Sequence, residues 1–111
     1  MNDRQFVSGA KRNNDNGKPK PLYLPFDVLM RVARHYEKGS SKFGNHNWRK
    51  GIPSTEYFNS MTRHISQYWE GKQDEDHLSA IVFNAIGIML NEEKFKDDEK
   101  IHDMISHWKD L

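Results

Sequence analysis

Asn84 interrupts the most apolar stretch of the chain, and two further polar residues, Asp74 and His77, come just before that stretch. On a helix they share one face, because His77 follows Asp74 by three positions and precedes Asn84 by seven. An unpaired amide at Asn84 would cost about 1–3 kcal/mol in such surroundings. Two interpretations follow: a hydrogen-bonded core network that fixes helix register, or a polar stripe that borders a ligand cavity between helices.

Arg63 and His64 form a second pair of side chains that could bind or orient a ligand. An arginine can hold a phosphate through two parallel hydrogen bonds, and a histidine can orient a water or a carboxylate. Adjacent helical residues point about 100° apart, so only one of the two faces the stripe squarely. The alternative is a surface arginine paired with an acid.

Two further groups of residues suit a charged ligand. The carboxylates could bind Mg²⁺ through oxygen, although acids at a helix start also serve capping and solubility; they are Glu70, Asp74, Glu75 and Asp76. A loop could hold a nucleotide, with its indole on the base and its donors on phosphate or sugar; its residues are Lys42, Asn47, Trp48, Arg49 and Lys50. Alternatively, Trp48 fastens this loop to the helices. The phosphate-binding pattern GxxxxGK[ST] is absent.

Helical periodicity predicts the elements that would position these residues. A first helix is expected from Pro25 to a cap at Gly39, followed by a long loop over 40–53. A second helix is expected from an N-cap at Ser54 to Gly71, and a third over 74–91, apolar on nearly all sides from Leu78 to Leu90 and therefore enclosed. The apolar positions of the first two helices are Leu29, Val32, Ala33 and Tyr36, then Phe58, Met61, Ile65 and Tyr68.

A final helix is expected from about Asp97, with apolar residues at helical spacing: Ile101, Met104, Ile105 and Trp108. No strand pattern is present. The predicted fold is therefore all-α: a four-helix, bundle-like domain over 22–111 with a long loop between its first two helices. Residues 1–21 read as a flexible basic arm, either solvated or ordered over an anionic ligand or a neighbouring subunit.

Composition excludes several classes of protein. The 111 residues suffice for one domain, and the net charge of +1 provides no field for binding nucleic acid. The absence of cysteine excludes disulfides and thiolate sites. Without a membrane span or secretory signal, a cytosolic location is expected. Hydrophobic residues make up only 35% of the chain, and together with the separate apolar stripes this favours self-association.

Several short motifs occur together in a recognisable order. They are SGAKR (8–12), Gly17–Lys18, YEKG (36–39), KFGNHNWRKGIPS (42–54), RH (63–64) and DEDHLxAxxxN (74–84). On these motifs the chain resembles the phage dATP/dGTP diphosphohydrolase N-terminal domain family, a relative of MazG-type all-α nucleotide pyrophosphohydrolases.

The resemblance implies hydrolysis of a purine deoxynucleoside triphosphate to the monophosphate and pyrophosphate, in the host cytoplasm if the protein is phage-encoded. It implies Mg²⁺ or Mn²⁺ as the cofactor and sites shared between subunits. The residues that would serve metal binding are Glu70, Asp74 and Asp76; those with catalytic roles are His64, Asp74 and His77; those that would bind the nucleotide are Lys42, Asn47, Trp48, Arg63 and Asn84.

The sequence departs from the MazG pattern at its acidic pairs. Those enzymes carry ExxE and ExxD pairs, whereas here Glu70 is followed three residues later by Gln73 and Asp74 by His77. The MazG metal cage therefore cannot be transferred position by position. Three hypotheses remain: a Mg²⁺- or Mn²⁺-dependent nucleotide pyrophosphohydrolase, a non-catalytic protein that sequesters a nucleotide, and a purely structural helical module.

Overall fold

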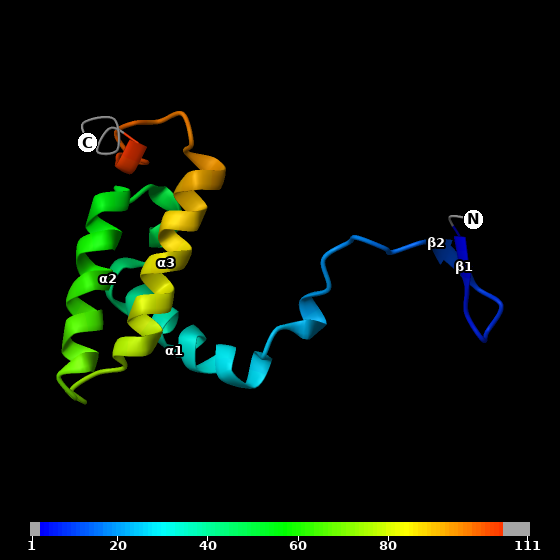
Figure 1. Ribbon diagram of the computed structural model, residues 1–111, viewed down its shortest axis with the longest axis horizontal. Coiled ribbons are helices and arrows are strands. Elements are labelled where there is room, and N and C mark those ends of the chain that lie inside the picture. The colour runs from blue at the N-terminus through cyan, green and yellow to red at the C-terminus, as the bar shows by residue number, and fades with distance from the viewer. Residues whose placement is uncertain (1–2, 106–111) are drawn as a thin grey trace.

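Three α-helices form the body of the protein in the computed structural model, which describes residues 3–105. They are α1 (Phe26–Phe43), α2 (Ser54–Trp69) and α3 (His77–Lys94). α2 and α3 lie side by side and antiparallel, and α1 packs across α3 (Figure 1). The expectation of a mostly helical chain is confirmed, but a four-helix arrangement is not supported. None of the described helices is long and apolar enough to cross a membrane.

α1 is longer than its sequence predicts. Gly39 lies inside the helix, which continues to Phe43 and ends at Gly44, where φ is +93° and the backbone N–H bonds to the carbonyl of Ser40. One glycine inside a helix costs only about 1 kcal/mol, and the positive φ makes Gly44 the better terminator. The connecting loop is therefore shorter than expected, and it contains a 3₁₀ turn, η2 (Asn47–Lys50).

The contact between α2 and α3 is made largely by small and polar side chains. The buried residues of α3 recur at helical spacing along one stripe: His77, Ala80, Asn84, Gly87 and Asn91. On α2 they meet Ser54 and Tyr57, which are also buried. Ser54 does not cap α2 as predicted. It is the first helical residue, and its hydroxyl instead bonds to Asn91 Nδ2 at 2.9 Å and to His102 Nδ1 at 2.9 Å.

The apolar stripes predicted for the second and third helices lie largely outside this contact. Phe58, Ile65 and Tyr68 of α2 are 42–53% exposed, and α3 is not enclosed. Its exposed residues follow one stripe, Leu78, Val82, Ile86 and Met89. The prediction of buried stripes was wrong because the small and polar residues allow closer helix approach and thus form the internal contact.

The predicted final helix is replaced by turns over 95–103, and helical geometry is present only at Met104 and Ile105 within the described residues. Tertiary hydrogen bonds hold this segment against the start of α2. The carbonyl of Ile101 accepts from Ser54 N–H at 2.8 Å, and Asp103 accepts from the Thr55 hydroxyl at 2.6 Å. These bonds compete with the helical pattern; Trp108 lies outside the described residues.

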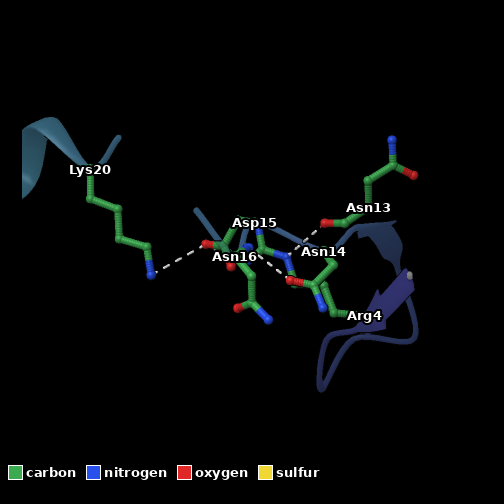
Figure 2. A network of polar contacts seen from close by, with 6 residues as sticks. All are labelled: Arg4, Asn13, Asn14, Asp15, Asn16 and Lys20. Atoms are coloured by element: carbon green, nitrogen blue, oxygen red, sulfur yellow. Dashed lines mark hydrogen bonds and ion pairs between the residues drawn. The ribbon is translucent and has the colours of Figure 1, made fainter. Parts of the chain in front are cut away.

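The N-terminal arm contains a small antiparallel hairpin, β1 (Asp3–Gln5) and β2 (Lys11–Asn13), which the sequence did not predict. Figure 2 shows the polar network beside it: Arg4 bonds to the carbonyl of Asn13 at 3.2 Å and to Asp15 at 3.1 Å, and Lys20 lies 3.5 Å from Asp15. The hairpin is exposed and lies far from the helices, at the end of an extended segment with a 3₁₀ turn, η1 (Pro21–Tyr23) (Figure 1).

Candidate functional site

Three side chains converge where α2 ends near the start of α3. His64 of α2, Glu75 of the connecting turn and His77 of α3 each offer one ligand atom, and these atoms lie within 4.8 Å of one another. We call these three residues the His–Glu cluster. The Nδ1 atoms of His64 and His77 are 2.9 Å apart. His77 is buried, His64 is half-buried and Glu75 is exposed. The cluster is therefore held in place at His77 and open to solvent at Glu75.

Asp74 determines how His77 presents its ring. Its Oδ1 lies 2.8 Å from His77 Nε2, and this hydrogen bond lowers the pKa of Asp74. A carboxylate only accepts, so Nε2 of His77 carries a hydrogen, and in the neutral ring Nδ1 then presents a lone pair toward His64. With both rings neutral, the hydrogen between them is on His64 Nδ1. Asp74 itself remains 64% exposed, while the side chain of His77 is 1% exposed.

The carboxylate of Asp76 is occupied by hydrogen bonds within the fold. It accepts two hydrogen bonds from Arg31, at 2.7 and 2.8 Å, which hold the pKa of its carboxyl far below the usual value. It also caps α3 by accepting from the backbone and hydroxyl of Ser79. The ion pair explains why Arg31 of α1 lies beside the start of α3.

The three predicted metal ligands do not form a carboxylate cage for Mg²⁺. Asp76 bonds to Arg31, Glu70 lies 3.5 Å from Lys72, and Asp74 holds His77. Among residues 3–105, the set whose ligand atoms converge is His64, Glu75 and His77 instead. Mg²⁺ prefers oxygen ligands, whereas two of these three converging donors are imidazole nitrogens.

A cavity of about 300 Å³ lies between α1, the η2 turn and Phe83 of α3, a volume at the lower end of small-molecule sites. Its walls are aromatic: the ring centroid of Tyr36 is 4.7 Å from that of Phe83 and 5.6 Å from that of Trp48. Lys42 and Asn47 also line it. Three predicted nucleotide-binding residues (Lys42, Asn47 and Trp48) are thus brought together around an apolar hollow with polar groups.

Trp48 fastens the loop to the helices while it lines this cavity. Its ring contacts Tyr36 edge-on, and its backbone carbonyl accepts from the Tyr57 hydroxyl at 3.4 Å. The guanidinium of Arg49 lies 4.4 Å from the Trp48 ring centroid. A base that stacks on this face of the indole would have to displace Arg49.

His35 of α1 connects the cavity with the His–Glu cluster. It lines the cavity with its ring centroid 5.1 Å from that of Phe83, and it interacts electrostatically with Glu75 and His64. Burial lowers its pKa, partly offset by Glu75, which favours a neutral ring at pH 7. The sequence pattern did not single out His35, because one histidine beside an apolar stripe carries no distinctive spacing.

Two other predicted site residues lie elsewhere. Asn84 is buried between α2 and α3, where its Nδ2 donates to the carbonyl of Ala80 at 2.7 Å and to Ser60 Oγ at 3.3 Å. It does not line the aromatic cavity, so the polar stripe is a packing network at this position. Arg63 is exposed and makes no hydrogen bond or ion pair within residues 3–105, whereas its neighbour His64 faces the stripe.

Comparison with known proteins identifies the family. No curated protein and no solved structure matches the chain significantly. The family pattern described as dATP/dGTP diphosphohydrolase, N-terminal, matches residues 8–101. This range includes the second hairpin strand, all three helices, the aromatic cavity and the His–Glu cluster. The chain belongs to the dATP/dGTP diphosphohydrolase N-terminal family.

Proposed function

We propose that the protein hydrolyses a purine deoxynucleoside triphosphate to the monophosphate and pyrophosphate. The observation that carries the proposal is the adjacency of an aromatic cavity and the His–Glu cluster, joined by His35. The family description names dATP and dGTP as the substrates of such proteins. Residues 22–111 would form the nucleotide-binding unit.

The cavity and the His–Glu cluster would bind different parts of the nucleotide. The purine would lie against Tyr36, Trp48 and Phe83, and the amide of Asn47 would hydrogen-bond base or sugar. The ammonium of Lys42 would offset phosphate charge from the cavity rim. His35 lies two helical turns before Lys42, about 10 Å along the helix, which leaves room for the sugar and triphosphate to reach the cluster.

At the cluster, the ring of His64 would orient the attacking water toward the α-phosphorus, and His77 would hold that ring through its Nδ1. The new bond forms between the water oxygen and phosphorus while a proton of the water passes to Nε2 of His64, the bond from phosphorus to the α–β bridging oxygen breaks, and pyrophosphate leaves. Asp74 acts as a positioning residue, because it holds the ring of His77 without facing the cavity. Arg63, exposed on α2, is available to a phosphate that extends beyond the cluster.

A second candidate is a protein that binds a nucleotide without cleaving it. The specific observation in its favour is that Glu70, Asp74 and Asp76 do not converge on a metal position. Such a protein would use the same aromatic cavity and would sequester a nucleotide or nucleotide signal.

One assay separates the two functions. The purified protein is incubated with each of the four dNTPs and with Mg²⁺, Mn²⁺ or Zn²⁺, and monophosphate and pyrophosphate are measured. Turnover of dATP or dGTP that falls at least a hundredfold in His64→Gln supports hydrolysis. The aromatic variant Phe83→Ala should weaken purine binding in either case. Tight binding with no product would overturn hydrolysis and favour sequestration.

We also propose that the protein self-associates through the exposed apolar faces of α2 and α3. These faces carry Phe58 and Ile65 on one helix and Leu78, Val82 and Ile86 on the other. A second copy is the expected occupant, because apolar stripes on two adjacent helices match the two-helix contribution that each subunit makes to a bundle.

A further inference from the structure

We propose that the His–Glu cluster is a binding site for a divalent transition-metal ion of the Zn²⁺ type, and that it does not select Mg²⁺. The ligands would be the two imidazole nitrogens of His64 and His77 and the carboxylate of Glu75. The inference about binding does not depend on the proposed hydrolysis, since it concerns only these donors.

The types of ligand atom in the cluster determine which metal ion it prefers. Imidazole suits Zn²⁺, Fe²⁺, Co²⁺ and Ni²⁺, whereas Mg²⁺ favours oxygen ligands. Two histidines and one carboxylate are the three-ligand set of known catalytic zinc sites, which leave a position open for water. With no cysteine in the chain, no thiolate competes for the ion. Mn²⁺, one of the two ions expected from the sequence, should bind more weakly than Zn²⁺.

The geometry of the two rings agrees with this assignment. Two nitrogens bonded to one ion at 2.0–2.1 Å lie roughly 3–3.4 Å apart, and the two Nδ1 atoms are already 2.9 Å apart. Loading therefore needs a separation of only a few tenths of an ångström. The hydrogen on His64 Nδ1 must leave, and the ring stays neutral by carrying it on Nε2 instead.

The surroundings supply the outer support that metal-bound histidines usually have. Asp74 accepts from Nε2 of His77 at 2.8 Å, which fixes the ring with Nδ1 toward the ion position. Entry is open on one side, since Glu75 is exposed and a second hollow of about 450 Å³ is lined by Glu75 and His77. His77 is anchored by burial, and Glu75 can close onto the ion from the turn.

The test is a titration of tag-free protein with ZnCl₂, MnCl₂ and MgCl₂ by calorimetry, with Co²⁺ absorption as the spectroscopic readout. We expect one Zn²⁺ per chain and no measurable heat with Mg²⁺. Glu75→Gln should weaken Zn²⁺ binding at least tenfold and His64→Gln at least a hundredfold, each with loss of the Co²⁺ visible bands. Asp74→Asn should weaken it about tenfold by releasing His77.

Matched controls give the test its specificity. Glu70→Gln removes another exposed carboxylate, and His46→Asn removes an exposed histidine whose φ of 59° asparagine tolerates. Both should bind Zn²⁺ within twofold of the unchanged protein. Should His64→Gln fail to fold, Glu75→Gln decides, because an exposed side chain on a turn is not needed for packing.

Three results would overturn the inference: no Zn²⁺ binding, Zn²⁺ binding that Glu75→Gln leaves unchanged, or Mg²⁺ binding as tight as that of Zn²⁺. Its failure is distinguishable from that of the proposed hydrolysis. Zn²⁺ binding without turnover of any dNTP would keep the metal site and remove the hydrolase. Turnover of dATP or dGTP by a protein that binds no Zn²⁺ in the titration would keep the hydrolase and remove the metal site.

Discussion

Gly87 and Tyr57 meet where α3 lies against α2. A Cβ built on Gly87 would overlap the ring of Tyr57, and that ring is buried. Burial also raises the pKa of the Tyr57 hydroxyl to about 12. The close approach of the two helices thus depends on one missing side chain. Gly39 of α1, by contrast, has no atom within 4 Å of its added Cβ position.

These two glycines predict opposite responses to the same substitution. Gly87→Ala should destabilise the fold by about 1–3 kcal/mol, because the ring or the helix must move. Gly39→Ala should stabilise it by about 0.4–1 kcal/mol, because alanine restricts the unfolded chain and favours the helix. Urea denaturation followed by circular dichroism measures both. Equal effects of the two substitutions would contradict the packing described for Gly87.

Asp76 gives the fold a dependence on pH. Hydrogen bonds from Arg31 and Ser79 depress its pKa in the folded protein. A depressed carboxyl pKa contributes stability above the unfolded value of about 4, and this contribution is lost as the pH falls below it. Asp76→Ala should therefore cost about 1–2 kcal/mol at pH 7, mostly from the lost cap.

The cost of Asp76→Ala should shrink as denaturation curves are repeated from pH 5 down to pH 2.5. The control is Asp27→Ala in the first turn of α1, a carboxylate without a hydrogen bond inside residues 3–105. This control should change stability by no more than about 0.5 kcal/mol. A penalty for Asp76→Ala that stays constant down to pH 2.5 would show that Asp76 is not held ionised.

At the level of elements, hydrogen bonds between polar side chains determine how α2 and α3 align against each other. Asn84 bonds to Ser60 across the contact, and Asn91 bonds to Ser54 Oγ and to the carbonyl of Ile52. These bonds need one register of the two helices, since a buried amide left without partners is costly. The network also fixes the turn over 101–103 through Ser54 and His102.

Removing the Asn91 side chain should test this network. Asn91→Ala removes the donor to the Ile52 carbonyl and one of the hydrogen bonds of the Ser54 hydroxyl, and it should reduce the free energy of unfolding by about 1–3 kcal/mol. Asn59→Ala, an exposed asparagine on α2, should change it by less than about 0.5 kcal/mol. Thermal unfolding of both variants is the measurement. If they unfold at the same temperature, the Asn91 bonds contribute no net stability.

At the level of the whole molecule, the single chain leaves much apolar surface uncovered. Its Cα radius of gyration is 18.9 Å, against about 13 Å for a compact chain of this length. The extended arm accounts for the shape in Figure 1. Among residues 3–105 the buried hydrophobic residues are Val32, Tyr57 and Ala80, whereas exposed apolar side chains occur on α1, α2 and α3. A single copy of the chain therefore leaves apolar surface exposed that a partner could bury.

Charge placed on the apolar faces should therefore separate the subunits. Ile65→Glu and Val82→Glu each put a carboxylate on a face that we expect a second copy to cover, and both should yield monomers in light scattering after gel filtration. Ser66→Glu, at the next exposed position of α2, should keep the original mass. A monomeric unchanged protein, or variants with its same multimeric mass, would contradict self-association.

The local signals in the sequence predicted much of the secondary structure. Helical spacing located all three helices, and the Pro25 and Gly71 boundaries are within a few residues of the true ends. Lys42, Asn47 and Trp48, which the sequence placed in one loop, line the same cavity because they lie close along the chain, although Lys42 belongs to α1. The hairpin was missed, since strands of three exposed residues carry no apolar alternation.

Periodicity by itself determined that this chain is helical and which positions are apolar, because both depend on neighbours within a few residues. Which face of a helix turns inward depends on the partner helix, and only the tertiary structure decided it. The small and polar stripe with Asn84 and Gly87 packs inside, while Leu78 and Val82 face out. The same packing brings His64 and His77, thirteen residues apart, to within 2.9 Å, and no spacing rule along one helix could predict that contact.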